Sequence, residues 1–433
     1  MADLPPIPDE PVTLALVGAG SRSSTHYAPA LRALEPWYDF VAVCDPVEEH
    51  ADEFAAELGI EAYYDIHKLV DDRPMEAAIA VTPIDSHHSI SVYLSRNGVN
   101  NMVETTMARS LTQAREMVET ARENDVTFRV AENFFRKPID RIVQTIMAED
   151  AIEGIRRIFC YNDHTGYHNN SRWIRFFDRA EWVQSVEHTI PTAPFDESRQ
   201  RHHEEETFRG RYFGFPDGEL VVDQASNIKA FLGRHPRPGY TEWQGRQGTI
   251  VQRAVTDRPH DGRSAYSSAA ETEIRYTSDE ALKLSVNAGR PDVYTDIENE
   301  FTEDDWVRTT AELPDGSTLS YENPLRLSEL CADQAHRDEL EVPYDIEIMG
   351  HLVDFALAVR GIREGEFTDE DALSAMEMEV GAKESARRDG ERVDLPVEGD
   401  LPVDEDIHAA QREKHGVDPL DVDEMLALTY PKP

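Results

Sequence analysis

The stretch Val17-Gly18-Ala19-Gly20-Ser21-Arg22 decides the fold of the first half of this chain. An apolar run, Thr13–Val17, leads into it, and a helical pattern over Ser24–Leu34 follows it. Between a strand and a helix, the first glycine permits a tight turn, and the second lets the backbone approach a pyrophosphate at the helix N-terminus. We therefore predict that the phosphates of a dinucleotide bind at Gly18, Gly20, Ser21 and Arg22. The alternative is a purely structural turn.

Two further positions bear on this nucleotide site. Ser23 stands where the dinucleotide fingerprint usually has its third glycine. Asp45 ends the next predicted strand, 27 residues after Gly18. A carboxylate there accepts hydrogen bonds from a ribose 2′-hydroxyl and repels a 2′-phosphate, so the pattern favours NAD over NADP. Asp45 is also suited to be the N-cap of a helix with Pro46 at its first position, and the two roles are compatible.

Short apolar runs alternate with longer amphipathic ones over residues 12–137, which predicts a doubly wound parallel sheet, a Rossmann domain. The predicted strands are Thr13–Val17, Phe40–Cys44, Ala77–Val81, Asn101–Val103 and Thr127–Ala131. The predicted helices are Ser24–Leu34, Val47–Leu58, Ser86–Asn97 and Leu111–Asn124, and Ser110 with Gln113 forms a capping box before the last of them. The fold class is therefore α/β.

A second domain, residues 138–397, has a different pattern. After a helix over Ile139–Met147 come strand-like segments without long helices between them, which favours a large, mostly antiparallel open sheet. These segments are Arg156–Asn162, Thr249–Ala254, Thr272–Tyr276, Leu282–Val286 and Trp306–Thr310; helical patterns return over Ile346–Val359 and Asp369–Arg388. The polar span 185–211 is expected to be a loop or insertion. Residues 1–11 are expected to be an N-terminal tail, and residues 398–433 an acidic, partly ordered one.

The composition excludes several classes of protein. The 433 residues include 85 Asp and Glu against 43 Lys and Arg, a formal net charge of −42. Such a charge repels nucleic acid and anionic membranes, so neither is an expected partner, and its spread along the chain is typical of a salt-adapted protein. No apolar run reaches the roughly 18 residues of a membrane helix. Three scattered cysteines, Cys44, Cys160 and Cys331, suit a reducing cytoplasm rather than disulfides or zinc.

Polar residues follow two of the predicted strands, Ala77–Val81 and Asn101–Val103, at the sheet edge where ligands of such folds bind. Thr82-Pro83 is followed by His87, and Glu104-Thr105-Thr106 comes seventeen residues after that histidine. This series, with the glycine turn, resembles the Gfo/Idh/MocA oxidoreductases. The resemblance covers roughly residues 12–397. It continues through Glu132-Asn133-Phe134-Phe135-Arg136-Lys137-Pro138, Gly245-Arg246-Gln247-Gly248-Thr249, Asp371-Ala372-Leu373 and Val393-Asp394-Leu395-Pro396.

The resemblance implies hydride transfer between NAD(P) and a hydroxyl of a sugar, inositol or related polyol. It also implies a homo-oligomer that forms through the sheet of the second domain. It places Thr82, Pro83, His87, Glu104 and Asn133 beside the cofactor. Structural roles remain open for two of these residues, as a helix start for His87 and as a helix-flanking carboxylate for Glu104.

The chain departs from the family at both positions that usually handle the substrate proton. The family's Glu-Lys-Pro is Glu104-Thr105-Thr106 here, so a threonine replaces the lysine. The family's Asp-x-Gly-x-His-x-x-Asp helix best matches residues 223–230, so Asn227 replaces the histidine. Neither threonine nor asparagine has a pKa suited to accepting a proton. On the expected helix, Lys229 faces away from Asp223 and Asn227 and is not an obvious substitute.

Other groups remain candidates for the catalytic base. Asp223 is one, and His164, Tyr167 and His168 lie in a polar segment after the first strand of the second domain. That segment is otherwise a surface loop. No metal site is expected, because neither His164 with His168 nor His202 and His203 with Glu204–Glu206 has a third ligand at diagnostic spacing. The predicted catalytic residues are Glu104, Asp223, Asn227, His164, Tyr167 and His168.

Three functions therefore remain open. The first is an NAD-dependent oxidoreductase whose proton transfer is reassigned to one of these groups or to water. The second is a catalytically retired protein that binds NAD and a sugar as a sensor or partner. The third is a redox-neutral enzyme in which transient oxidation by NAD labilises a neighbouring bond, as in NAD-dependent glycosidases. The sequence does not name the sugar or the size of the oligomer.

Overall fold

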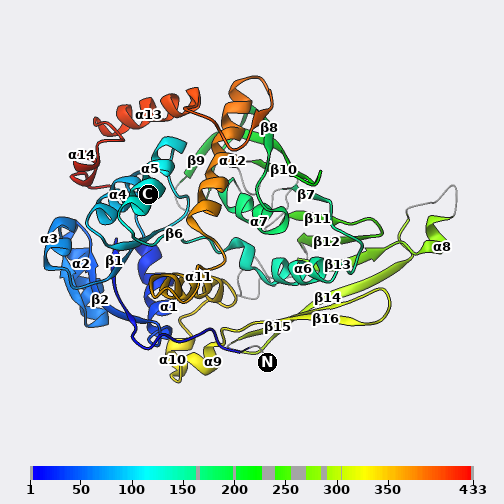
Figure 1. The fold of residues 1–433 in the computed structure, drawn as a ribbon, viewed down its shortest axis with the longest axis horizontal. Helices are drawn as coiled ribbons and strands as arrows, with labels where there is room; N and C mark the ends of the chain where they lie inside the picture. Colours follow the sequence, from blue (N-terminus) through cyan, green and yellow to red (C-terminus); the bar gives the residue numbers. More distant parts are fainter. Residues whose placement is uncertain are drawn as a thin grey trace. The chain divides into compact units, whose positions relative to one another are not determined.

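The computed structural model describes two compact units (Figure 1). The parallel-sheet unit comprises the residues up to Asn133, Pro324–Val380 and the residues from Gly399 onward; the antiparallel-sheet unit comprises Phe134–Asn323 and Gly381–Glu398. The residues described are 3–161, 166–197, 201–226, 239–254, 270–283, 290–303 and 305–430. Both units are therefore built from separate stretches of sequence, whereas the sequence pattern predicts one domain after the other.

The parallel-sheet unit contains the predicted Rossmann sheet. Its strands are β1 (Val12–Val17), β2 (Tyr38–Cys44), β3 (Glu61–Tyr63), β4 (Ala77–Ala80), β5 (Asn100–Val103) and β6 (Phe128–Val130). They are parallel and lie in the order β3-β2-β1-β4-β5-β6. β1 and β4 are almost wholly buried, as expected for central strands covered by helices on both faces. The predicted doubly wound fold is confirmed, and β3 is an additional edge strand.

The parallel-sheet unit also contains helices. They are η1 (Ser23–Tyr27), α1 (Ala28–Ala33), α2 (Glu48–Leu58), α3 (Ile66–Asp72), η2 (Ile84–Ser86), α4 (His87–Arg96), α5 (Leu111–Glu123), α9 (Leu327–Leu330), α10 (Gln334–Arg337), α11 (Tyr344–Val359), α13 (Pro402–His415) and α14 (Val422–Leu426). The predicted capping box of Ser110 and Gln113 opens α5. α12 (Asp369–Arg387) begins in this unit and ends in the other.

The antiparallel-sheet unit has an eleven-stranded sheet in the order β16-β15-β14-β13-β12-β11-β7-β10-β9-β8-β17. Its strands are β7 (Arg157–Tyr161), β8 (Trp182–Glu197), β9 (Arg201–Gly214), β10 (Leu220–Ser226), β11 (Tyr240–Gln244), β12 (Gly248–Ala254), β13 (Ala270–Tyr276), β14 (Val293–Phe301), β15 (Trp306–Glu312), β16 (Thr318–Glu322) and β17 (Val393–Asp394). β10 pairs with β7 in parallel, and the other pairs are antiparallel. The helices are η3 (Phe134–Arg136), α6 (Pro138–Ala148), α7 (Tyr167–Phe177) and α8 (Asp279–Leu282). The predicted mostly antiparallel sheet is confirmed.

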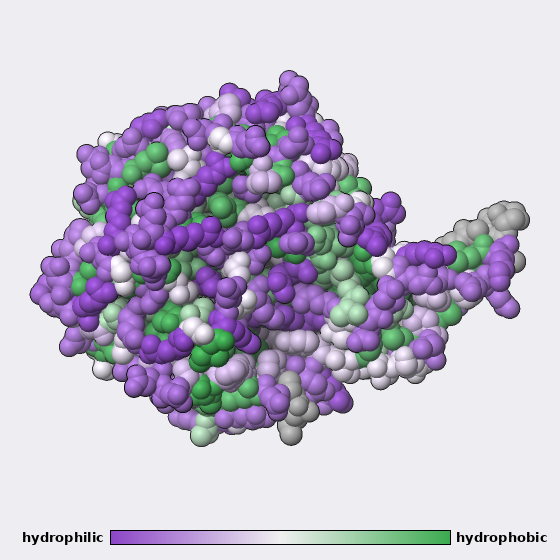
Figure 2. Space-filling model, viewed as in Figure 1, coloured by the Kyte–Doolittle hydropathy of each residue, from purple (hydrophilic) through white to green (hydrophobic). Residues whose placement is uncertain are grey.

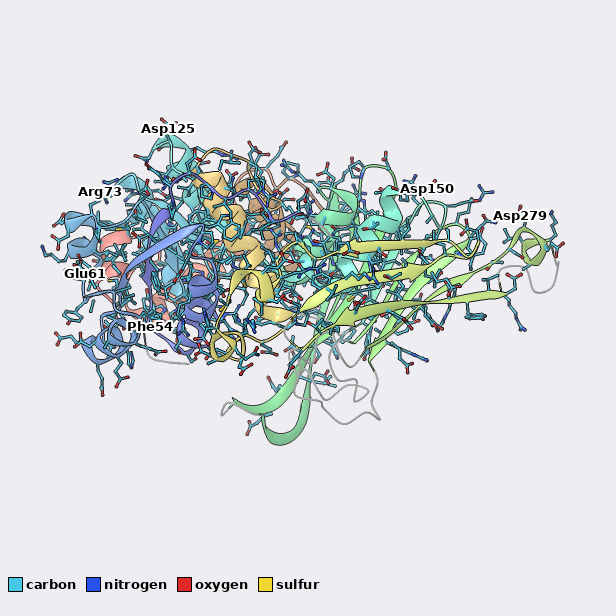
Figure 3. All side chains as sticks on the ribbon, turned by 90° about the horizontal axis from the view of Figure 1, so that it is seen from below. Phe54, Glu61, Arg73, Asp125, Asp150 and Asp279 are labelled. Atoms are coloured by element: carbon cyan, nitrogen blue, oxygen red, sulfur yellow. The ribbon has the colours of Figure 1, made fainter. Side chains whose placement is uncertain are left out.

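Four local predictions are wrong. The span 185–211 is not a loop: β8 and β9 pair along most of it and form a long curved ribbon (Figure 3). Asp223 lies on strand β10 rather than on a helix. Leu282 ends helix α8 instead of beginning a strand. Much of the expected acidic tail is helical, in α13 and α14.

Hydrophilic residues cover most of the face shown in Figure 2, as expected from the acidic composition. Among the described residues, the exposed large hydrophobic side chains include three on the β8–β9 ribbon, Val186, Ile190 and Tyr212, and Tyr294 on β14. In the part of the chain that the structure describes, every helix is too short or too polar to cross a lipid bilayer.

Candidate functional site

The glycine turn after β1 is built as the sequence predicts. Gly18 has φ +101°, a backbone conformation that favours glycine, and its N–H donates to the Cys44 carbonyl at 2.7 Å. A Cβ added to Gly18 would lie 2.4 Å from the Val81 carbonyl oxygen. At Gly20, by contrast, an added Cβ would meet no atom within 4 Å. The turn is therefore closed against the sheet at Gly18 and open at Gly20.

Ser23 fills the position of the missing third glycine without disrupting the turn. Its side chain is fully buried, and its Oγ donates to the Gly18 carbonyl at 2.7 Å. The Gly20 carbonyl accepts from the Ser24 N–H at 3.1 Å, which begins the helical turn. A serine is thus accommodated because its hydroxyl bonds to the backbone of the turn it closes.

Asp45 lies at the end of β2 beside the glycine turn. Its Oδ2 accepts from the Ala19 N–H at 2.8 Å, and its Oδ1 accepts from the Val47 N–H at 2.9 Å. The predicted N-cap role is wrong, since Val47 is the N-cap of α2 and no side chain caps that helix. Asp45 instead fixes the turn, and each carboxylate oxygen retains a second lone pair for a ribose hydroxyl.

These residues fit a dinucleotide. The open space at Gly20 admits a phosphate close to the backbone, and the helix that follows presents N–H groups without intrahelical acceptors. The carboxylate of Asp45 is at the position where a ribose binds in this fold. Gly18, Gly20, Ser21 and Asp45 are the residues that would hold NAD, and Ser21 is exposed at the start of the helix.

The loop after β4 is tied to the loop after β5 through His87. The His87 ring is buried, with Nε2 at 2.9 Å from the Thr82 carbonyl oxygen and Nδ1 at 3.0 Å from that of Thr106. Burial lowers the pKa of this ring, against the effect of the two carbonyls. His87 is the first residue of α4 and joins the segments that follow β4 and β5. This arrangement agrees with the structural role, a helix start, that the sequence left open. Thr82 and Pro83 lie in the same loop, before η2.

Glu104 is the centre of a buried ionic cluster at the end of β5. Its Oε1 accepts from Arg22 Nε at 2.7 Å and from the Tyr27 hydroxyl at 3.1 Å. Its Oε2 accepts from the N–H and Oγ1 of Thr105 at 2.7 and 3.0 Å. Burial alone would raise the pKa of Glu104, but the Arg22 guanidinium and these hydrogen bonds lower it to about 2. A carboxylate of such low pKa is a poor general base.

The threonine that replaces the family's lysine thus has a defined partner. Thr105 donates two hydrogen bonds to Glu104 and holds its carboxylate toward Arg22. Arg22, predicted to contact phosphates, directs its Nε to Glu104 and another guanidinium nitrogen to the Tyr344 hydroxyl at 2.5 Å.

Helix α11 adds residues that sequence reasoning missed. Besides Tyr344, it places Asp345 Oδ1 2.7 Å from His26 Nδ1, and Glu347 Oε2 accepts from Asn133 Nδ2 at 3.1 Å. Asp345 and Glu347 are buried. The available signal was the pair of carboxylates at the start of a largely apolar helix, since buried carboxylates require partners.

Asp223 lies in the antiparallel-sheet unit, in a site unsuited to a base. It is fully buried on β10, directly opposite Arg211 of β9, whose guanidinium pairs with its Oδ2 at 2.5 Å. Asn169 Nδ2 and Trp173 Nε1 each donate to Oδ2 at 3.3 Å. The carboxylate therefore binds the sheet to helix α7.

The remaining predicted catalytic residues are only partly described. Tyr167 is buried at the first position of α7, and the His168 ring lies against the Phe134 ring, with centroids 4.5 Å apart. His164 and Asn227, and with them Lys229, lie outside the described residues. The predicted surface loop over 161–168 thus ends in a helix from Tyr167 onward.

Comparison with known proteins agrees with this geometry. Residues 12–132 match the family described as "Oxidoreductase family, NAD-binding Rossmann fold", the Gfo/Idh/MocA family. This match confirms the resemblance to the Gfo/Idh/MocA oxidoreductases over residues 12–132, the Rossmann domain. The predicted cofactor, NAD, is confirmed with it, since the matched family is NAD-binding.

The chain is similar to scyllo-inositol 2-dehydrogenase (NAD(+)) of Bacillus subtilis, with 31% identity over 120 residues, 28% of this chain and 35% of that protein. The matched stretches span 35% and 24% of the two curated relatives. Two of the solved structures that share the fold each have 16% identity over 89% of this chain. One is an oxidoreductase from Agrobacterium radiobacter in complex with NAD+, L-tartaric acid and magnesium (TM-score 0.60, 98% of that chain). The other is a levoglucosan dehydrogenase in complex with NADH and levoglucosan (TM-score 0.61, 100% of that chain).

Proposed function

We propose that this protein is an NAD-dependent oxidoreductase that transfers a hydride between nicotinamide and a hydroxyl of a sugar, inositol or related polyol. The observation that carries the proposal is the glycine turn, closed at Gly18, open at Gly20 and fixed by Asp45, in a domain of an NAD-binding oxidoreductase family. The polyol class is supported by the relatives, among them an inositol dehydrogenase and a levoglucosan dehydrogenase.

Bound NAD would supply the hydride acceptor, and the residues of the chain would position the reactants and accept the proton. Glu104 is unsuited to accept it because Arg22 keeps its carboxylate ionised at a pKa of about 2. Asp223 is unsuited because it is buried in an ion pair with Arg211. We therefore propose that water or a group of the 164–168 segment, which includes His164, Tyr167 and His168, accepts the proton. In this proposal Asn227 contacts the substrate without accepting the proton.

The test of the activity is a panel of inositols, anhydrosugars, aldoses and sugar acids, assayed with NAD and NADP in molar KCl. NADH formation with one class of polyol, and a lower KM for NAD than for NADP, is the expected result. The NAD preference should be lost in Asp45→Ala and kept in Asp72→Ala, which removes a carboxylate from the exposed end of α3. If neither nucleotide is reduced by any member of the panel, the proposed oxidoreductase function is wrong.

The proton acceptor is tested separately. His164→Gln and His168→Gln are compared with His67→Gln, which changes an exposed histidine of α3. Loss of kcat and of its acidic pH limb in one of the first two variants would identify the base. Unchanged profiles in both would leave Tyr167→Phe to separate a tyrosine from water.

The contacts of Thr105 favour a second candidate, a protein that binds NAD and a sugar without turnover. Thr105 stands where the family has its lysine, and its N–H and hydroxyl groups donate hydrogen bonds to Glu104. Bound NAD without turnover across the panel would support this candidate. Release of a leaving group without net NADH would instead indicate the redox-neutral, glycosidase-like reaction.

We also propose a homo-oligomer in a salt-rich cytoplasm. The exposed Val186, Ile190 and Tyr212 on the β8–β9 ribbon support an assembly through the antiparallel sheet, and the net charge of −42 supports adaptation to salt. Light scattering in molar KCl tests the assembly: Val186→Asp should reduce the mass to that of a monomer. A monomeric wild-type protein would contradict the proposal.

A further inference from the structure

The last helices of the chain pack on the parallel-sheet unit. We call residues 399–426, with α13 and α14, the clasp. Its α14 contacts α4, and Val422 and Met425 of α14 are buried. Figure 1 draws α13 and α14, at the red end of the chain, beside α5 and α4. The clasp is joined to this unit by polar bonds as well as apolar contacts, and these bonds converge on two loops.

The first loop is held through Asp85, which follows β4 and is 4% exposed. Its Oδ1 accepts from Arg109 Nε at 2.5 Å, and its Oδ2 from Lys414 Nζ at 2.6 Å and His415 Nε2 at 2.9 Å. Burial alone would raise the pKa of this carboxyl, but these three basic groups hold it well below its usual range. Because Arg109 lies after β5 and Lys414 and His415 lie on α13, Asp85 joins three segments of the chain.

The second loop is held through Asp404 of the clasp. Its Oδ1 accepts from the Leu111 N–H at 3.0 Å, and its Oδ2 from the N–H and Oγ1 of Thr112, each at 2.9 Å. His408 Nε2 lies 2.8 Å from Ser110 Oγ, the N-cap of α5. The clasp therefore provides acceptors for the first N–H groups of α5, which have none within the helix.

Three of the residues expected beside the cofactor, Thr82, Pro83 and Glu104, lie in these same two loops, and His87 follows the first of them. Ser86, next to Asp85, donates from its Oγ to Thr82 Oγ1 at 2.8 Å. His87 bridges the Thr82 and Thr106 carbonyls, and Glu104 begins the loop that ends at Ser110. A shift of Asp85 or of the start of α5 would thus move the ends of β4 and β5 together.

We propose that the clasp is part of the nucleotide-binding machinery: through Asp85 and Asp404 it holds the loops after β4 and β5 in the conformation that binds NAD. Asp85 is then a positioning residue, which acts through Thr82 and His87 and not by contact with the nucleotide. The proposal rests on the NAD binding of the proposed function. By linkage, NAD must stabilise the clasp as much as the clasp strengthens NAD binding.

The experiment measures the Kd of NAD by calorimetry on full-length variants in molar KCl, with unfolding midpoints recorded without NAD. Lys414→Met removes a cation from Asp85, and Lys68→Met is its matched control, since Lys68 pairs with Asp72 at the same 2.6 Å and is similarly exposed. Asp85→Asn removes the carboxylate charge, and Lys414→Arg restores a cation. Hydrogen exchange of the Leu111 and Thr112 amides is followed with and without NAD.

We expect the Kd of NAD to rise about tenfold in Asp85→Asn and several-fold in Lys414→Met. The Kd should remain at the wild-type value in the control Lys68→Met and should return toward it in Lys414→Arg. The two amides should exchange more slowly when NAD is bound. If Asp85→Asn does not fold, the exposed Lys414 still provides the test. Wild-type Kd in folded Lys414→Met, with exchange unaffected by NAD, would overturn the proposal while leaving the proposed function intact. A wild-type protein that does not bind NAD would overturn both.

Discussion

The ionic cluster around Glu104 leads to a quantitative prediction: Glu104→Gln should destabilise the folded protein by about 3 kcal/mol at neutral pH. Arg22 and the hydrogen bonds from Tyr27 and Thr105 lower the pKa of this buried carboxyl from its ordinary 4.5 to about 2. Each pKa unit corresponds to about 1.4 kcal/mol, so a pKa lower by about 2.5 stabilises the fold by about 3 kcal/mol. Glutamine keeps the shape of the side chain but has no charge to pair with Arg22.

The pH dependence follows from the direction of the shift. Because the pKa is lower in the folded protein, the stabilisation is complete well above the unfolded value of about 4.5 and is lost as pH falls through about 2. The difference in unfolding free energy between wild type and variant should therefore be less than half of its neutral-pH value at roughly pH 3. Urea unfolding measures it, with Glu57→Gln on the exposed face of α2 as the control. A difference below about 1 kcal/mol at neutral pH, or one that does not change with pH, would refute the reasoning.

Three further predictions concern the turn, the second unit and salt. Gly18→Ala should lower Tm and abolish the NAD-induced rise in Tm, because the new Cβ would lie 2.4 Å from the Val81 carbonyl oxygen. Gly20→Ala should keep the wild-type Tm but bind NAD weakly, because its Cβ would lie in the open space expected for a phosphate. Equal Tm in the two variants would contradict this difference. Arg172→Met removes a guanidinium that lies 2.8 Å from the Asp140 carboxylate, and both side chains are fully buried. The free energy of unfolding, measured in urea, should fall by about 3–5 kcal/mol. A fall of less than about 1 kcal/mol would contradict a structural role for this ion pair. Raising KCl from about 0.1 to about 1 M shortens the Debye length from about 10 to about 3 Å and so screens the repulsion between the many carboxylates. The Tm of the protein should therefore rise, and a fall in Tm would count against salt adaptation.

The sequence predicted the elements whose local residue pattern matches the burial that they have in the fold. The strands β1 and β4 are short apolar runs because both faces are covered, and the Ser110–Gln113 capping box depends on neighbours in the sequence alone. These features are predictable because the residues that determine them are close together in the chain. The glycine turn is also recognised from contiguous residues, 17–22, although Cys44, Asp45 and Val81, which are distant in sequence, complete it.

The failures share the opposite property, because they depend on partners distant in sequence. Asp223 reads as a helical position by similarity, yet its strand is determined by pairing with β7 and β9 and by the ion pair with Arg211. The β8–β9 ribbon includes the charged run Arg201–Glu206, which favoured a loop when the sequence was considered alone. The clasp was not predicted because its bonds to Asp85 and to α5 join positions about 300 residues apart.

The discontinuity of the parallel-sheet unit has a consequence for synthesis on the ribosome. Its β-strands are complete at Val130, but α11 and the clasp belong to the same unit and emerge only after residues 134–323. At about 5–20 residues per second, those 190 residues take about 10–40 s. During that interval the nascent sheet lacks the helix that carries Tyr344 and the acceptors for the start of α5. The parallel-sheet unit is therefore completed only after all the residues of the antiparallel-sheet unit have been synthesised.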